Sequence, residues 1–190
     1  MSNSFNLKAF EKLPTTLKPS DYVDFLLFFL REKPCIRLGA NQKNVYQEMT
    51  QWCKENNLSY IISGDGLMYI AKHKIFAKIA NIVDDSVIDH AFLLGRLLGY
   101  PACCSKKVAV VGEGNIDEYE KTLVQNNSFC PPYHITNPQG YLYGYSLISH
   151  IPCCANCKQS LKKASKAYKV IEKYKDHPAF YRWTNHWFEQ

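Results

Sequence analysis

The sequence has no apolar run long enough to cross a lipid bilayer. Its most hydrophobic stretch, residues 23–30, is interrupted by Asp24 and is far shorter than the ~20 apolar residues that a transmembrane helix needs. The first 18 residues also lack the apolar segment of a secretory signal peptide. We therefore expect a cytoplasmic protein with no membrane partner.

The sequence also lacks the short motifs of several large enzyme classes. It contains no phosphate-binding P-loop, no Gly-x-Gly-x-x-Gly fingerprint and no His-Glu-x-x-His zinc motif. None of its histidines begins the His-x-Glu motif that accompanies Pro-Cys in zinc nucleobase deaminases. The pattern Cys154-x-x-Cys157 is formally that of thioredoxin-like proteins. Residues 141–148 before it, however, are a poor candidate for the strand that this fold requires.

The composition of the chain is that of a folded globular protein. Of its 190 residues, 46% are hydrophobic and 21% are charged, which excludes a disordered tail. The net charge of +6 permits an anionic partner without requiring one. Eight cysteines are present. In a cytoplasmic protein, cysteines serve as thiols, metal ligands or catalytic groups more often than as structural disulfides.

The N-terminal half predicts a small sheet flanked by helices. Residues 34–38, 58–62 and 67–71 have strand character, and the Asp-Gly in residues 63–66 is a strong hairpin signal. Helical periodicity covers residues 21–31 and 41–56. The expected fold class is α+β, with a short N-terminal sheet and mostly helices in the C-terminal two-thirds. We expect a loose arm over residues 1–20 and one domain over 21–190, which consists of an α/β part (21–82) and a helical, cysteine-rich part (83–190).

Helices are expected to dominate the second half. One should run from Ser86 to Leu98 and end at Gly99, and another should begin at Pro101, because proline suits the first helical position. A superficial helix over 116–125 and a long ordered loop over 126–145 follow. The last helical stretch carries a basic face that could contact nucleic acid or an acidic protein, formed by Lys162, Lys166, Lys169 and Lys173.

Two cysteine clusters stand out from this background. Cys103-Cys104 and Cys153-Cys154 each follow a proline where a helix is expected to begin. Unpaired backbone N–H groups and the positive end of the helix dipole would stabilise thiolates there. Cys157 lies at helical spacing from the second pair. Cys35 and Cys53 are expected to be buried core residues, whereas Cys130, beside two prolines, is equally compatible with a core or a functional role.

The two clusters resemble the signature of an uncharacterised prokaryotic domain family. Its pattern is a Gly-Tyr-Pro-x-Cys-Cys segment, here residues 99–104, followed by His-x-Pro-Cys-x-x-x-Cys-x-x-Ser, here residues 150–160. The resemblance covers about residues 86–165, and Cys154 is an addition to the pattern. No reaction is established for that family, so the resemblance implies none here. The resemblance implies that one site contains Cys103, Cys104, His150, Cys153 and Cys157.

Three functions are compatible with these residues. The first is an enzyme or enzyme component whose two clusters converge on zinc or an iron–sulfur cluster. Its small substrate would bind beside the loop residues Tyr133, Asn137 and Tyr143. The second is a metal-free enzyme, for example in sulfur transfer, with Cys104 or Cys153 as the nucleophile and His134 or His150 as the base. The third is a binding module for RNA or an acidic protein, in which the metal is purely structural.

Overall fold

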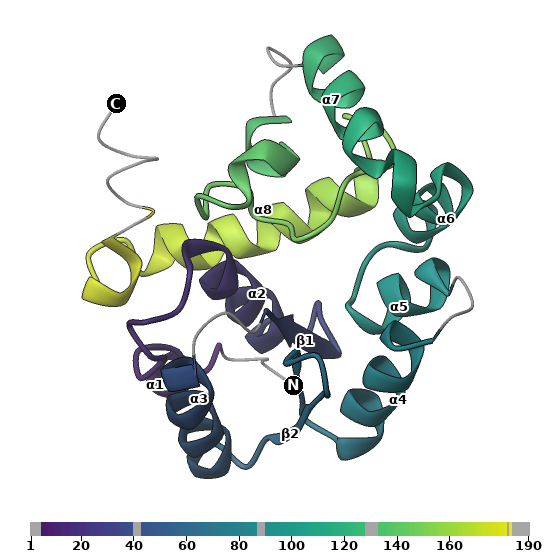
Figure 1. Ribbon diagram of the computed structural model, residues 1–190. Coiled ribbons are helices and arrows are strands. Elements are labelled where there is room, and N and C mark those ends of the chain that lie inside the picture. Colours follow the sequence, from purple (N-terminus) through teal and green to yellow (C-terminus); the bar gives the residue numbers. More distant parts are fainter. Residues whose placement is uncertain (1–4, 40–42, 87–89, 128–132, 182, 184–190) are drawn as a thin grey trace.

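The protein is described here by a computed structural model, which places residues 5–39, 43–86, 90–127, 133–181 and 183. A three-stranded sheet lies in the N-terminal half and helices make up most of the remainder, so the predicted α+β class is confirmed (Figure 1). None of the described helices is long and apolar enough to pass through a bilayer.

The sheet consists of β1 (Cys35–Leu38), β2 (Ser59–Ile62) and β3 (Met68–Ala71). Its order is β1-β3-β2 and both pairs are antiparallel, with Ile70 opposite Ile36 on one side and Tyr60 on the other. The hairpin between β2 and β3 turns at residues 63–66, as predicted, and Gly66 adopts a positive φ of 85° there. The short apolar strands therefore pair as the sequence predicts.

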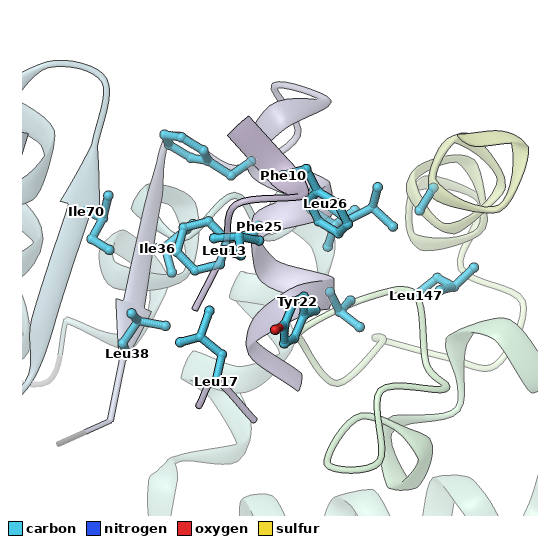
Figure 2. Packing of buried hydrophobic residues seen from close by; sticks show 14 of the residues in the cluster. Phe10, Leu13, Leu17, Tyr22, Phe25, Leu26, Ile36, Leu38, Ile70 and Leu147 are labelled. Atoms are coloured by element: carbon cyan, nitrogen blue, oxygen red, sulfur yellow. The ribbon is translucent and has the colours of Figure 1, made fainter. Parts of the chain in front are cut away.

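The two faces of the sheet belong to different cores, because side chains alternate along a strand. Ile36 and Ile70 face a large core that includes α2 (Pro19–Phe29) and α3 (Lys43–Glu55). Figure 2 shows part of this core, in which Ile36 and Ile70 lie near Phe25. Tyr69 faces a smaller core under α4 (Lys74–Asp84), a helix that the sequence analysis does not predict.

The N-terminal segment is not a loose arm, which corrects that prediction for the residues described. It forms α1 (Leu7–Phe10), and Phe10 is only 1% exposed. The Phe10 ring stacks on Phe180, with 5.2 Å between ring centroids, and on Trp183. The partner surface thus comes from the other end of the chain, about 170 residues away in sequence. A local sequence pattern cannot reveal a partner at that separation.

The second half places its helices around the cysteine clusters. They are α5 (Ala91–Leu97), α6 (Ala102–Val111), α7 (Ile116–Asn127) and α8 (Lys158–Lys173). Short 3-10 turns separate or follow them: η1 (Glu113–Asn115), η2 (Tyr133–Thr136), η3 (Pro138–Gly140) and η4 (Pro178–Phe180). The predicted helix over 86–98 begins only at Ala91, and residues 87–89 lie outside the description. Gly99 follows it with φ of +82°, and α6 begins directly after Pro101, as expected.

Gly95→Ala is expected to weaken the packing of α5 against α6. An added Cβ would lie 2.7 Å from Ser105 Oγ and 3.2 Å from Ser105 Cβ. We expect the free energy of unfolding to fall by about 1–3 kcal/mol from this overlap, despite the better helix propensity of alanine.

Removal of the Ser105 hydroxyl is the control for the contact between residues 95 and 105. Ser105 Oγ is buried and finds no hydrogen-bond partner among the described residues. Ser105→Ala alone should therefore be nearly neutral, and the Gly95→Ala/Ser105→Ala double variant should recover part of the loss. Urea denaturation of the four proteins measures this. Equal destabilisation of the single Gly95→Ala and the double variant would show that Ser105 is not the source of the overlap.

Candidate metal centre

The first cysteine pair lies in the first turn of α6, as the sequence predicts. Gly99 reverses the chain after α5, and Pro101 precedes α6 in an extended conformation with ψ of 144°. Cys103 is exposed and Cys104 is fully buried. Successive helical residues point about 100° apart, so only Cys104 turns toward the interior.

The second pair does not begin a helix, which corrects the prediction for residues 152–154. This segment is an irregular turn, and α8 begins at Lys158 with Cys157 as its N-cap residue. The turn is closed by a hydrogen bond from Cys157 N to Cys154 O at 3.1 Å. Tyr119 of α7 also donates its hydroxyl proton to Pro152 O at 2.9 Å. Cys153 and Cys157 therefore approach each other through a turn rather than along a helical face.

Four sulfur atoms meet where these segments join. The Sγ atoms of Cys103, Cys104, Cys153 and Cys157 all lie within 4.8 Å of one another. Cys157 Sγ is 3.7 Å from Cys103 Sγ and 3.6 Å from Cys104 Sγ, and the latter two are 3.9 Å apart. The prediction that the two clusters converge is confirmed. Four such thiols could hold a metal ion.

Hydrogen-bond donors surround two of these sulfurs. The Cys153 backbone N–H points at Cys104 Sγ at 3.3 Å, and Ser160 Oγ lies 3.4 Å from the same sulfur. Burial still raises the pKa of the Cys104 thiol to about 12. Burial alone would also raise the pKa of Cys157, but hydrogen bonds from the Ser160 hydroxyl and backbone N–H outweigh it and lower that pKa to about 7. Without a cation the cluster thus favours one thiolate, at Cys157.

His150 lies next to this group but is not one of its four members. Its Nε2 is 2.8 Å from Ser160 Oγ, so the serine stands between the imidazole and Cys104. The imidazole also packs on the Tyr100 ring, with 5.2 Å between centroids. Burial, followed by repulsion from Lys163 and Lys33, lowers the pKa of His150 to about 3. The imidazole is therefore neutral at physiological pH.

A buried ion pair fixes the segment that leads to His150. Lys33 Nζ contacts Asp24 Oδ1 at 2.6 Å and Ser149 Oγ at 2.7 Å, and both charged side chains are 4% exposed. Tyr141 donates its hydroxyl proton to Asp24 Oδ2 at 3.0 Å. The hydrogen bonds from Lys33 to Ser149 and from Tyr141 to Asp24 offset part of the cost of burying the two charges. The network ties residues 141–149 to α2 and thereby sets the position of His150.

A cavity of about 360 Å³ opens beside His150. The imidazole, Tyr100 and Tyr141 line it together with Arg37 of β1. Most of the remaining wall is apolar and comes from α5, α6, α7 and Ile151. The volume is near the lower end of the range for small-molecule sites, about 300–1,000 Å³.

The predicted substrate residues lie elsewhere or outside the description. Tyr143 is 68% exposed and stacks on Tyr145, and Asn137 caps η3 by accepting a hydrogen bond from Gln139 N. Neither lines the cavity. The side chains of Tyr133 and His134 lie outside the described part of the chain, so the proposed base role of His134 stays a prediction.

The remaining cysteines fall into two groups. Cys35 and Cys53 are fully buried core residues, as predicted, and burial raises the pKa of each thiol to about 12. Cys154 is exposed and is not one of the four clustered thiols, although it neighbours them in sequence. Cys130 lies outside the described residues.

The basic side chains of α8 form an exposed face, as predicted, with Lys162, Lys166 and Lys169 all at the surface. Lys166 contacts Glu32, so part of this charge is already neutralised within the molecule.

Ser160 and Tyr100 both contact His150, and neither has a role predicted from the sequence. The signal was present, since Tyr100 lies in the Gly-Tyr-Pro segment and Ser160 ends the second motif. No family model, curated protein or solved structure matches this chain. The site is therefore interpreted from its own geometry.

Proposed function

We propose that this protein binds one zinc ion through Cys103, Cys104, Cys153 and Cys157. We also propose that this metal centre stabilises the wall of a small-molecule cavity. The observation that carries the proposal is the spacing of the sulfurs. A tetrahedral ion with metal–sulfur bonds of about 2.3 Å places its ligand atoms about 3.8 Å apart, from the edge length of a tetrahedron. The three sulfur separations given above, 3.6, 3.7 and 3.9 Å, match this value.

The same spacing disfavours a multinuclear iron–sulfur cluster. In a [4Fe–4S] cluster each thiolate binds a different iron, so the four cysteine sulfurs stand around a cube and are much farther apart. A mononuclear site leaves zinc and a single iron as candidates with equal bond lengths. We favour zinc because it is the usual occupant of closed tetrathiolate sites.

The proposed role of the metal is structural. Four protein ligands leave no open position for water or substrate, whereas catalytic zinc sites keep one. The ion would join the start of α6 to the turn before α8, two segments about 50 residues apart. The same segments carry Val108 and His150, which both line the cavity. The activity proposed for the protein is therefore binding or conversion of a small molecule in this cavity.

The metal-free nucleophile is less well supported. Cys104 is fully buried and its pKa is raised, so it offers little thiolate and no access for a substrate. Burial, followed by repulsion from Cys104, also raises the pKa of Cys153. The thiol with the lowered pKa is Cys157, which is 4% exposed.

Metal analysis tests the proposal directly. Protein purified without oxygen should carry about one equivalent of zinc per chain. Replacement by Co²⁺ should give the intense visible absorption of a tetrahedral thiolate complex, and metal binding should release protons from the thiols. Folded protein without any metal, or with several irons per chain, would contradict the tetrathiolate proposal.

A further inference from the structure

We propose that the cavity beside the metal centre binds a small molecule with three features: an apolar, flat body, a carboxylate, and an N–H or O–H group that donates to His150 Nδ1. The inference rests on the proposed tetrathiolate, because ligation of the sulfurs fixes the direction of the hydrogen bonds that end at His150.

One direction of the hydrogen bonds is favoured once the thiolates bind a metal. A metal-bound thiolate has no proton and can only accept, and a hydrogen bond to a charged acceptor is stronger than one to a neutral imidazole. We therefore assign the single Ser160 hydroxyl proton to the thiolate side, where Cys104 Sγ lies 3.4 Å away. The Ser160 oxygen is left to accept from His150 Nε2 at 2.8 Å. This assignment places the His150 proton on Nε2, and since the imidazole is neutral, Nδ1 bears a lone pair.

That lone pair is available to a ligand. His150 lines the cavity, and its ring is held from one side by Tyr100. Within the described part of the chain, no donor is hydrogen bonded to His150 Nδ1. Protonation of Nδ1 is opposed by the burial of the imidazole, followed by repulsion from Lys163 and Lys33. The ligand must consequently supply the proton of this hydrogen bond.

Arg37 favours a hydrogen-bond acceptor on the ligand, whereas His150 Nδ1 requires a donor. Its Nη1 contacts both carboxylate oxygens of Asp84 at 2.9 Å, which holds the guanidinium in place. The Nε and Nη2 donors are not used in this pair, and Arg37 lines the cavity. Guanidinium groups match carboxylates well because their donors form a planar fork. Glu120 also lines the cavity and would repel an anion, so the ligand carboxylate is assigned to the Arg37 end.

The remaining wall residues favour a ligand whose central part is apolar and flat. Leu94, Leu98 and Ile116 are apolar, and the rings of Tyr100 and Tyr141 offer flat surfaces. The volume of about 360 Å³ accommodates one or two rings.

Indole-3-acetate serves as the probe because it combines all three features. We expect the metal-loaded protein to bind it with a dissociation constant of about 1 mM or lower, from the usual affinity per atom of small ligands. Methylation of the indole nitrogen, or replacement of the carboxymethyl group by methyl, should each weaken binding about tenfold, the usual effect of one lost hydrogen bond or ion pair. Titrations of the unaltered protein, followed by calorimetry, measure all three affinities.

Variants locate the two contacts. His150→Phe should keep its zinc, since His150 is not a ligand, and should bind indole-3-acetate and its N-methyl analogue equally. Arg37→Met should lose the preference for the carboxylate, and Lys169→Met, on exposed α8, should leave every affinity unchanged. Nitrogen NMR of the imidazole should show the Nε2–H form in the loaded protein.

The outcomes separate this inference from the metal proposal. Absence of indole-3-acetate binding, an Nδ1–H imidazole, or loss of zinc in His150→Phe would overturn the assignment of His150. A metal-free protein that still discriminates against the N-methyl analogue would support the cavity contact and contradict the tetrathiolate.

Discussion

Cys104→Ser is expected to remove the metal and to destabilise the fold strongly, whereas Cys154→Ser should do neither. A serine hydroxyl is a poor ligand for zinc and stays protonated near neutral pH, so only three thiolates would remain. Position 104 is fully buried, and a hydroxyl there loses its water contacts. We expect the free energy of unfolding to fall by about 3 kcal/mol or more, which lowers the melting temperature by about 10 °C in a chain of this size.

Metal content and thermal unfolding of both variants measure the difference. Cys154 is the matched control, because it lies in the same turn as Cys153 but outside the sulfur group. A chelator should destabilise the unaltered protein and the Cys154→Ser variant, and should have little effect on Cys104→Ser. If Cys104→Ser kept its metal and its melting temperature, the assignment of the four ligands would be refuted.

Gly99→Ala should be the most damaging change outside the metal centre. Gly99 has φ of +82°, a conformation that costs a residue with a Cβ about 1–2 kcal/mol. The added Cβ would also lie 2.4 Å from Glu32 O and 2.7 Å from Lys33 Cα. These are backbone atoms, and the Lys33 side chain is fixed by its buried contact with Asp24, so the segment cannot easily retreat. We expect a total loss of more than about 3 kcal/mol in unfolding free energy.

Gly112→Ala separates the two causes. Gly112 has nearly the same φ, +79°, but nothing lies within 4 Å of its Cβ position. With ψ of 150°, Gly112 lies in a region essentially restricted to glycine, so this variant should lose only a conformational part of about 1–3 kcal/mol. Guanidinium denaturation compares the two variants, and any loss in Gly99→Ala beyond that of Gly112→Ala is attributed to the contact with residues 32–33. Because Gly99 leads into Pro101 and Cys104, Gly99→Ala should also weaken metal binding. Equal stability of the two variants would mean that the close contact is relieved without cost.

Much of the fold follows from local sequence. The short apolar runs in 34–38, 58–62 and 67–71, with an Asp-Gly turn, lead to the three strands and their hairpin. Gly99 and Pro101 mark the boundary between two helices, because backbone geometry restricts what can follow a helix. These features depend on residues within one element or one turn. The same holds for the burial of Cys35 and Cys53.

The sequence by itself also determined where the two cysteine clusters lie, and its resemblance to a domain family implied that one site contains Cys103, Cys104, Cys153 and Cys157 together with His150. Only the tertiary structure decided how they meet. Cys157 became an N-cap rather than a helical neighbour of Cys153, and the N-terminal segment found its partners near Phe180. His150 reached Ser160 instead of a sulfur, through differences of a few ångströms that the packing of α8 and the buried Lys33–Asp24 pair impose. Spacing along a chain specifies which groups are available, whereas the identity of the atom in contact depends on side chains from distant segments that pack together.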